Sequence, residues 1–192
     1  SISENENYET LYLYSNANLN AVVNNDVIEL KSDLFFKISY YEKLISPNFK
    51  EILWEFNQTK KYWTHWINKT PKFKKYNNEI LRSALTLKLL TYQKTGAVLA
   101  AVTTSLPETI GEERNWDYRF CWIRDASMVI KVVAKLGHKN IVKNFIKFII
   151  NLIPDKNEKL QIMYGINGEK ILEEKTLDHF SGYLDSSPVR IG

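Results

Sequence analysis

Two patterns of hydrophobic residues divide the chain near residue 46. The segments YETLYLY, AVVNNDVIEL and LFFKISYYEKL are short, rich in β-branched and aromatic residues, and separated by asparagine-rich breaks, which predicts strands. A set of so few strands is marginally stable unless it packs on something else. We therefore expect residues 1–45 to be the end of a β domain.

Helical spacing dominates after the strand-rich segment. Four helices are predicted, each by apolar side chains three and four residues apart and by a proline or glycine at a boundary. They are expected between Pro47 and Pro71, at about 77–95 before Gly96, from Asp125 to Gly137, and at about 139–153 before Pro154. The sequence thus indicates a β segment followed by a separate, mainly α domain.

Composition and charge exclude several classes of protein. The net charge of +4, from 26 basic and 22 acidic residues, is too small to imply nucleic-acid binding. No apolar run reaches the roughly 18 residues that a membrane span requires. The single cysteine, Cys121, fits a reducing compartment, and the N-terminal SISENENYET does not resemble a signal peptide. We expect a cytoplasmic protein with no nucleic-acid or membrane partner.

Residues 114–126, RNWDYRFCWIRDA, combine large rings with charges at unusual density. The rings of Trp116, Tyr118, Phe120 and Trp122 are two residues apart, so an extended backbone would point all four to one side. Rings cover the apolar faces of sugars, while arginine and aspartate hydrogen-bond to hydroxyl groups. The pattern therefore predicts a sugar-binding wall.

Arg124 and Asp125 fall at the predicted start of the third helix, where Asp125 is expected to be the N-cap. This leaves a purely structural alternative open. Asp125 would then only cap the helix, and Arg124 would pair with Asp117 or Glu108.

Other chemistries have little support in the sequence. The histidines, His65, His138 and His179, are far apart and lack metal-ligand spacing, and we expect ordinary surface or core positions. Cys121 has no nearby histidine and is expected to be a buried thiol. No nucleophile elbow or nucleotide-binding glycine loop is present. We predict no metal and no cofactor.

Three blocks carry a family resemblance: residues 82–126, the stretch LQIMYGINGE at 160–169, and HFSGYLDSSPVRIG at 179–192. They resemble the glucoamylase and trehalase family of glycoside hydrolases, family 15, in its archaeal and bacterial branch. The resemblance covers about residues 50–192. It implies the end of an N-terminal β-sandwich in residues 1–45, a helical linker in 46–76, and the first part of an (α/α)6 barrel catalytic domain in 77–192. The chain would then be an N-terminal fragment.

The resemblance also implies a reaction, the inverting hydrolysis of an α-glucoside. A carboxylic acid protonates the leaving oxygen while a carboxylate activates water. The substrate would be a maltooligosaccharide or trehalose, and glucose would be released. The family places both catalytic glutamates beyond Gly192, so we assign no catalytic residue here and expect the chain alone to be inactive. Glu108, Glu173 and Glu174 are the nearest acidic candidates, and the family pattern gives none of them that role.

The resemblance does assign substrate-binding residues. Arg124 and Asp125 match the pair that holds sugar hydroxyls, Trp122 matches the neighbouring aromatic residue, and Tyr118 matches a tyrosine near the attacking water. Arg190 lies in a block that reaches the mouth of the site. The expected partners are an α-glucoside and either the remainder of the polypeptide or a second copy, because half a barrel leaves apolar helix faces uncovered.

Two rival functions remain at this point. The chain would be a non-catalytic carbohydrate-binding module, or a relic, if no catalytic carboxylates accompany it. It would be a helical protein-interaction domain if the stripe formed by Lys139, Lys143 and Lys147 meets an acidic partner.

Overall fold

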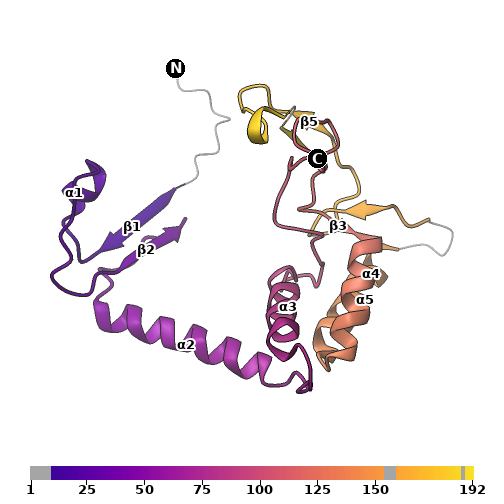
Figure 1. The fold of residues 1–192 in the computed structure, drawn as a ribbon, viewed down its shortest axis with the longest axis horizontal. Coiled ribbons are helices and arrows are strands. Elements are labelled where there is room, and N and C mark those ends of the chain that lie inside the picture. Colours follow the sequence, from indigo (N-terminus) through magenta and orange to yellow (C-terminus); the bar gives the residue numbers. More distant parts are fainter. Residues whose placement is uncertain (1–9, 154–158, 187–188) are drawn as a thin grey trace. The chain divides into compact units, whose positions relative to one another are not determined.

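The computed structural model describes residues 10–153, 159–186 and 189–192. The chain divides into two compact units, Ser1–His65 and Trp66–Gly192. A short strand-containing segment comes first and helices predominate after it (Figure 1), as the sequence predicts. The proposed domain boundaries near residues 45 and 76 remain predictions.

The first unit contains a two-stranded antiparallel sheet. Strand β1 (Leu11–Ser15) pairs with β2 (Phe36–Tyr40), so two of the three strand predictions are confirmed. The prediction of a strand in AVVNNDVIEL is wrong, because the first three residues of this segment belong to helix α1 (Leu19–Val23). The side chain of Asn18 caps α1 by accepting hydrogen bonds from the backbone N–H groups of the second and third residues after it.

Helix α2 (Phe49–Ile67) lies between Pro47 and Pro71, as predicted. Its start is fixed by a reciprocal capping box. The N–H of Glu51 donates to Asn48 Oδ1 at 3.1 Å, and the N–H of Asn48 donates to Glu51 Oε2 at 3.2 Å.

The second unit combines helices with very short strand pairs. The helices are α3 (Asn77–Leu89), α4 (Ile123–Lys135) and α5 (Lys139–Leu152), with a 3-10 turn, η1 (Tyr183–Asp185). Antiparallel pairs join β3 (Cys121–Trp122) to β4 (Met163–Tyr164) and β5 (Lys175–Thr176) to β6 (Arg190–Ile191). The third and fourth predicted helices are confirmed as α4 and α5. Gly137, with φ of +87°, follows the end of α4 as expected.

Helix α3 ends well before the predicted Thr95. The chain folds back instead, because the N–H of Tyr92 donates to the carbonyl of Ala97 and that of Gly96 donates to the carbonyl of Tyr92, both at 2.8 Å. A Cβ on Gly96 would lie 2.6 Å from backbone atoms of Asn144. Gly96 therefore permits close approach to α5 and does not stop a helix.

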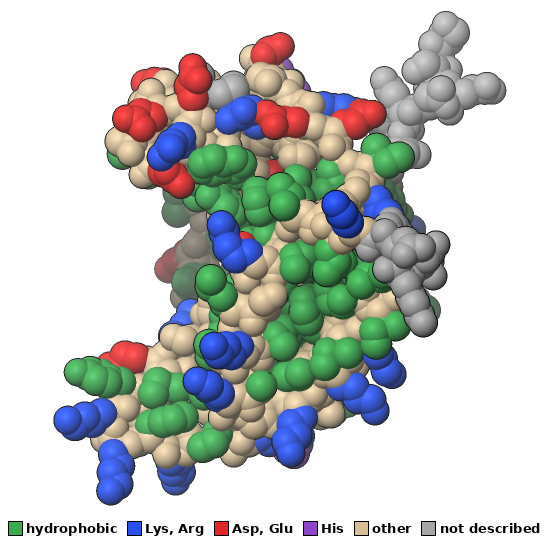
Figure 2. Space-filling view, turned by 90° about the vertical axis from the view of Figure 1, so that its right-hand side faces the viewer, with side chains coloured by type: hydrophobic (Ala, Val, Ile, Leu, Met, Phe, Trp, Pro, Cys, Tyr) green, Lys and Arg blue, Asp and Glu red, His purple; other side chains and the backbone are tan. Residues whose placement is uncertain are grey.

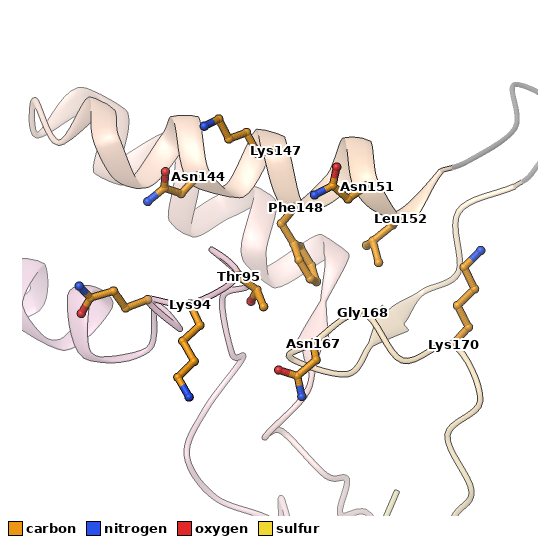
Figure 3. A pocket seen from close by; sticks show the side chains of 11 residues that line it. Lys94, Thr95, Asn144, Lys147, Phe148, Asn151, Leu152, Asn167, Gly168 and Lys170 are labelled. Atoms are coloured by element: carbon orange, nitrogen blue, oxygen red, sulfur yellow. The ribbon is translucent and has the colours of Figure 1, made fainter.

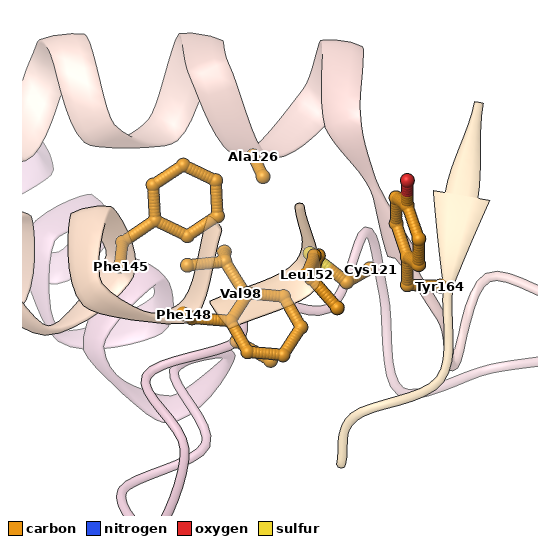
Figure 4. Packing of buried hydrophobic residues seen from close by; sticks show 8 residues of the cluster. Val98, Cys121, Ala126, Phe145, Phe148, Leu152 and Tyr164 are labelled. Atoms are coloured by element: carbon orange, nitrogen blue, oxygen red, sulfur yellow. The ribbon is translucent and has the colours of Figure 1, made fainter. Parts of the chain in front are cut away.

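A cluster of buried side chains joins α4, α5, β3 and β4 (Figure 4). Its members are Ala97, Val98, Cys121, Ala126, Phe145, Phe148, Leu152 and Tyr164. Burial raises the pKa of the Cys121 thiol, which is fully enclosed. The prediction of a buried thiol is confirmed.

The turn between α4 and α5 holds a buried histidine. The ring of His138 stacks on Trp66, with centroids 3.8 Å apart, and Nε2 lies 2.8 Å from Thr70 Oγ1. Burial, together with the positive charges of Lys69 and Lys88, lowers the pKa of His138. His138 is thus a core histidine that is neutral near pH 7.

Hydrophobic side chains also remain at the surface, and Figure 2 shows many of them gathered on one face. On α4 and α5 they include four residues that are between 46% and 64% exposed: Met128, Val132, Ile146 and Ile150. The stripe of Lys139, Lys143 and Lys147 is exposed on α5. In the described part of the chain, no helix is both long and apolar enough for a membrane crossing.

Candidate substrate-binding site

The predicted wall, residues 114–126, is built on a paired backbone. Residues 116–120 run antiparallel to residues 100–105, with Thr104 opposite Asp117. The N–H of Tyr118 donates to the carbonyl of Thr103 at 3.2 Å, and the carbonyl of Tyr118 accepts from the N–H of Ala101 at 2.9 Å. Strand β3 follows and leads directly into α4.

The sequence predicted an extended backbone for this stretch. The structure differs, because the backbone turns at Tyr118 and Arg119. Asp117 closes this turn, since its Oδ1 accepts the N–H of Arg119, two residues on, at 3.1 Å. The expected segregation of side chains survives in part. Asn115, Asp117 and Cys121 are buried, whereas the four rings are half-buried or exposed.

Two of the predicted ring residues lie together. The rings of Tyr118 and Trp122 have centroids 6.5 Å apart and an interplanar angle of 40°. The indole Nε1–H of Trp122 donates to the backbone carbonyl of Asp117 at 3.1 Å, which fixes the orientation of that ring. This pair presents adjacent aromatic surfaces next to the start of α4.

Arg124 and Asp125 are the second and third residues of α4, and Trp122 occupies the N-cap position. The prediction that Asp125 is the N-cap is therefore wrong. A carboxylate in the first turn is still favoured, because the unpaired N–H groups there carry partial positive charge. The structural pairings considered for Arg124 are also wrong, since Glu108 contacts Arg114 and Asp117 contacts Arg119.

The Arg124–Asp125 pair leaves polar groups available. A guanidinium nitrogen of Arg124 lies 3.2 Å from Asp125 Oδ2, and the Arg124 side chain is 72% exposed. This contact lacks the geometry of a hydrogen bond. Asp125 Oδ2 is buried and accepts no hydrogen bond from the described residues. The Arg124 guanidinium and the Asp125 carboxylate, with side chains 72% and 33% exposed, together offer the donor and the acceptor that a sugar hydroxyl needs.

Arg190, in β6, makes a different set of contacts. Its guanidinium donates to Glu174 Oε1 at 2.8 Å, to the carbonyl of Glu113 at 3.0 Å, and to both oxygens of Asn115 at 3.3 Å. Ser105 and Thr104 hydroxyls donate to the carbonyl of Arg190. Arg190 is thus a cross-link between loops, and its role in substrate binding stays a prediction.

Sequence reasoning missed the ion pair between Asp117 and Arg119. Arg119 Nε and Nη2 donate to Asp117 Oδ1 and Oδ2 at 2.9 and 2.7 Å. Burial raises the pKa of the Asp117 carboxyl, but the hydrogen bonds from Arg119 and from the N–H of Gly192 outweigh it, so the pKa lies below its ordinary value. The signal was present, because the alternation placed Asp117 and Arg119 on one side of the segment.

The three acidic candidates considered from the sequence lie at the surface. Glu108, Glu173 and Glu174 have side chains that are at least half exposed, and each contacts an arginine or a lysine. No cluster of three histidine, cysteine, aspartate or glutamate side chains suited to a metal ion occurs among the described residues.

Two hollows of the second unit differ in their relation to the wall. One, of about 550 Å³, lies between α5 and the loops at 93–95 and 167–170 (Figure 3). The amino groups of Lys94, Lys147 and Lys170 end on different sides of it, so they do not converge on a ligand. Another, of about 490 Å³, is lined by Asp117, Arg119 and Phe120 and lies beside the turn of the wall.

Comparisons with known proteins identify the family of the chain. Residues 74–192 match the model of the glycosyl hydrolases family 15. The chain is 41% identical over 167 residues to a trehalase of Mycolicibacterium smegmatis, which covers 83% of this chain and 25% of that protein. It is 42% identical over 135 residues to a trehalase of Thermoplasma volcanium, covering 70% of this chain and 21% of that protein.

The chain therefore belongs to family 15 of the glycosyl hydrolases, as the sequence blocks indicated. It spans about a quarter of the length of the curated relatives it matches. No solved structure matches it significantly.

Proposed function

We propose that the chain is part of an inverting glycoside hydrolase that releases glucose from trehalose, and that Tyr118, Trp122, Arg124 and Asp125 of the wall contribute to its glucose subsite. The observation that carries this proposal is the partly exposed Arg124–Asp125 pair in the first turn of α4, next to the adjacent rings of Tyr118 and Trp122. The sequence left maltooligosaccharides and trehalose open. We favour trehalose because the relatives described above are named trehalases.

In this proposal each residue of the wall has a distinct task. The Tyr118 and Trp122 rings cover the apolar face of a glucose unit, and Arg124 and Asp125 bind its hydroxyl groups. Contacts that strengthen as the ring approaches the transition state raise the rate. The acid and the base, about 6.5–9.5 Å apart, would lie outside this chain. The 192-residue chain alone then hydrolyses no trehalose.

The architecture follows the family. Residues 1–45 are proposed to end a β-sandwich, 46–76 to form a linker, and 77–192 to begin an (α/α)6 barrel. Later helices of the polypeptide, or a second copy of this chain, would cover the apolar side chains exposed on α4 and α5. Sedimentation of the isolated chain tests this, because an uncovered face predicts association and a clean monomer contradicts it.

The reaction is tested by proton NMR of the full gene product with trehalose. Inversion at one anomeric carbon gives β-glucose from the attacked unit and α-glucose from the leaving unit. We expect equal amounts of both anomers before mutarotation.

Three other outcomes would change the proposal. Faster release of β-glucose alone from maltotriose would indicate that the substrates are maltooligosaccharides. Glucose binding without any hydrolysis would favour the carbohydrate-binding alternative, and salt-sensitive polyanion binding without a sugar response would favour the interaction domain.

A further inference from the structure

Asp117 is the point at which three separate segments of the second unit are hydrogen-bonded together. Its side chain is 1% exposed. The two carboxylate oxygens accept four hydrogen bonds, three from Arg119 and one, at 3.1 Å, from the N–H of Gly192. Its backbone carbonyl accepts the indole N–H of Trp122, and its backbone bridges to Thr104.

These contacts exclude Asp117 from direct contact with a sugar. Both oxygens are enclosed and already bonded to protein groups, so neither can accept a hydroxyl proton. Burying a carboxylate is costly, and here the hydrogen bonds from Arg119 and Gly192 offset that cost. A further consequence of this arrangement is the geometry that it imposes.

That geometry concerns the two rings of the proposed wall. The turn that Asp117 closes contains Tyr118, so the carboxylate sets the direction in which this side chain leaves the backbone. The same turn places the carbonyl that holds the indole of Trp122. Through Gly192, it also ties the wall to the end of β6.

We propose that Asp117 is a positioning residue of the glucose subsite, which acts through the turn to hold Tyr118 and Trp122 in the arrangement that binds the sugar. This inference rests on the proposed function. A carboxylate is required because it accepts four hydrogen bonds, two at each oxygen, and only a group with two acceptor oxygens can satisfy all four donors. An amide would direct a donor at Arg119 or at Gly192.

The test is a double-mutant cycle in the full gene product with Asp117→Asn and Trp122→Phe, with kcat and KM measured for trehalose. Trp122→Phe removes the indole N–H and keeps a ring. We expect Asp117→Asn to lower kcat about 100-fold, as small misplacements of binding groups do, and Trp122→Phe to lower it about fivefold to tenfold. If Asp117 acts through the ring, the double variant is no slower than Asp117→Asn alone. If the two losses in kcat multiply instead, so that the double variant is roughly 500-fold to 1,000-fold slower than the wild type, the proposal is overturned.

A second readout does not depend on activity. The protein is labelled with 5-fluorotryptophan, and the Trp122 resonance is identified by its loss in Trp122→Phe. We expect Asp117→Asn to shift or broaden this resonance. His138→Gln serves as the control, because it perturbs a buried contact of the same unit outside the turn. An unmoved Trp122 signal in Asp117→Asn, or an equal change in both variants, would overturn the proposal.

The two failures are distinguishable. A wild-type protein that hydrolyses no trehalose contradicts the proposed function and, with it, the subsite role of Asp117. An active wild-type protein with independent effects in the cycle contradicts only the positioning role.

Discussion

The turn around Asp117 and the first turn of α4 around Asp125 each place a carboxylate beside an arginine. The two carboxylates differ in their exposure and in the hydrogen bonds that they accept. Asp117 is enclosed and accepts hydrogen bonds at both oxygens from Arg119 and Gly192. Asp125 is one-third exposed, and its Oδ2 accepts none from the described residues. An enclosed carboxylate with satisfied oxygens organises the backbone around it, whereas a partly exposed one can also contact a ligand. Residue type and neighbours alone do not distinguish these roles.

The largest expected effect is on turnover. Asp125→Asn should lower kcat/KM for trehalose about 100-fold to 1,000-fold in the full gene product, with little change in melting temperature, because the lost contact strengthens in the transition state. Glu79→Gln is a matched control, since Glu79 is also the third residue of its helix, α3, and is exposed. Near-normal turnover in Asp125→Asn would end the assignment of Asp125 to the subsite.

The two arginines should differ in their effects on stability. Arg119→Met leaves the enclosed Asp117 without its guanidinium, and we expect the free energy of unfolding to fall by about 1–3 kcal/mol. Arg124→Met removes an exposed contact and should change it by less than about 0.5 kcal/mol. Urea denaturation of both variants measures the difference. Equal losses would show that the two pairs are energetically alike.

Acid sensitivity gives a third contrast. The pKa of Asp117 is lowered in the folded protein, so its contribution to stability is complete above the unfolded value of about 4 and is lost as pH falls through the folded pKa. We expect the free energy of unfolding to fall less steeply with decreasing pH in Asp117→Asn than in the wild type when it is measured below about pH 4. This acid-dependent decrease is the acid limb of Asp117. An unchanged limb would mean that the carboxylate is not held as described.

The smallest expected effect lies in a separate pH window. The pKa of His138 is lowered in the folded protein, so the unfolded chain takes up a proton first as pH falls below about 6.5, and stability decreases from there towards the folded pKa. His138→Gln should remove this slope and leave the acid limb of Asp117 unchanged. Thermal melts between about pH 7 and pH 5 test this. If stability still decreases with falling pH in His138→Gln, another group causes the decrease.

Local sequence predicted the existence of helices α2, α3, α4 and α5 from helical spacing. A proline or glycine marked the end correctly for α2, α4 and α5, but Gly96 did not mark the end of α3. The prediction was wrong where a side chain redirects the backbone. Asn18 caps α1, which extends into the start of an apparent strand, and Asp117 bends the run of alternating rings.

The sequence was sufficient to propose the binding residues, but it did not predict which hydrogen bonds their side chains make. Tyr118 and Trp122 do lie together, and Asp125 does lie at the start of α4, although not as its cap. One hydrogen bond to the Asp117 carboxylate comes from Gly192, 75 residues away, and the glycine at position 96 is required by the close approach of Asn144. No local pattern contains such long-range contacts.

The hydrogen bond from Gly192 to Asp117 has a consequence for synthesis. A ribosome adds about 5–20 residues per second, so the donor follows the acceptor by roughly 4–15 s. During that interval the Asp117 carboxylate can accept hydrogen bonds from Arg119 but not from Gly192, and the segment from Thr104 to Trp122 lacks its tie to β6. The wall is therefore expected to be completed late, after α4 and α5 have been synthesised, and a pause in translation between the two residues would prolong its unfinished state.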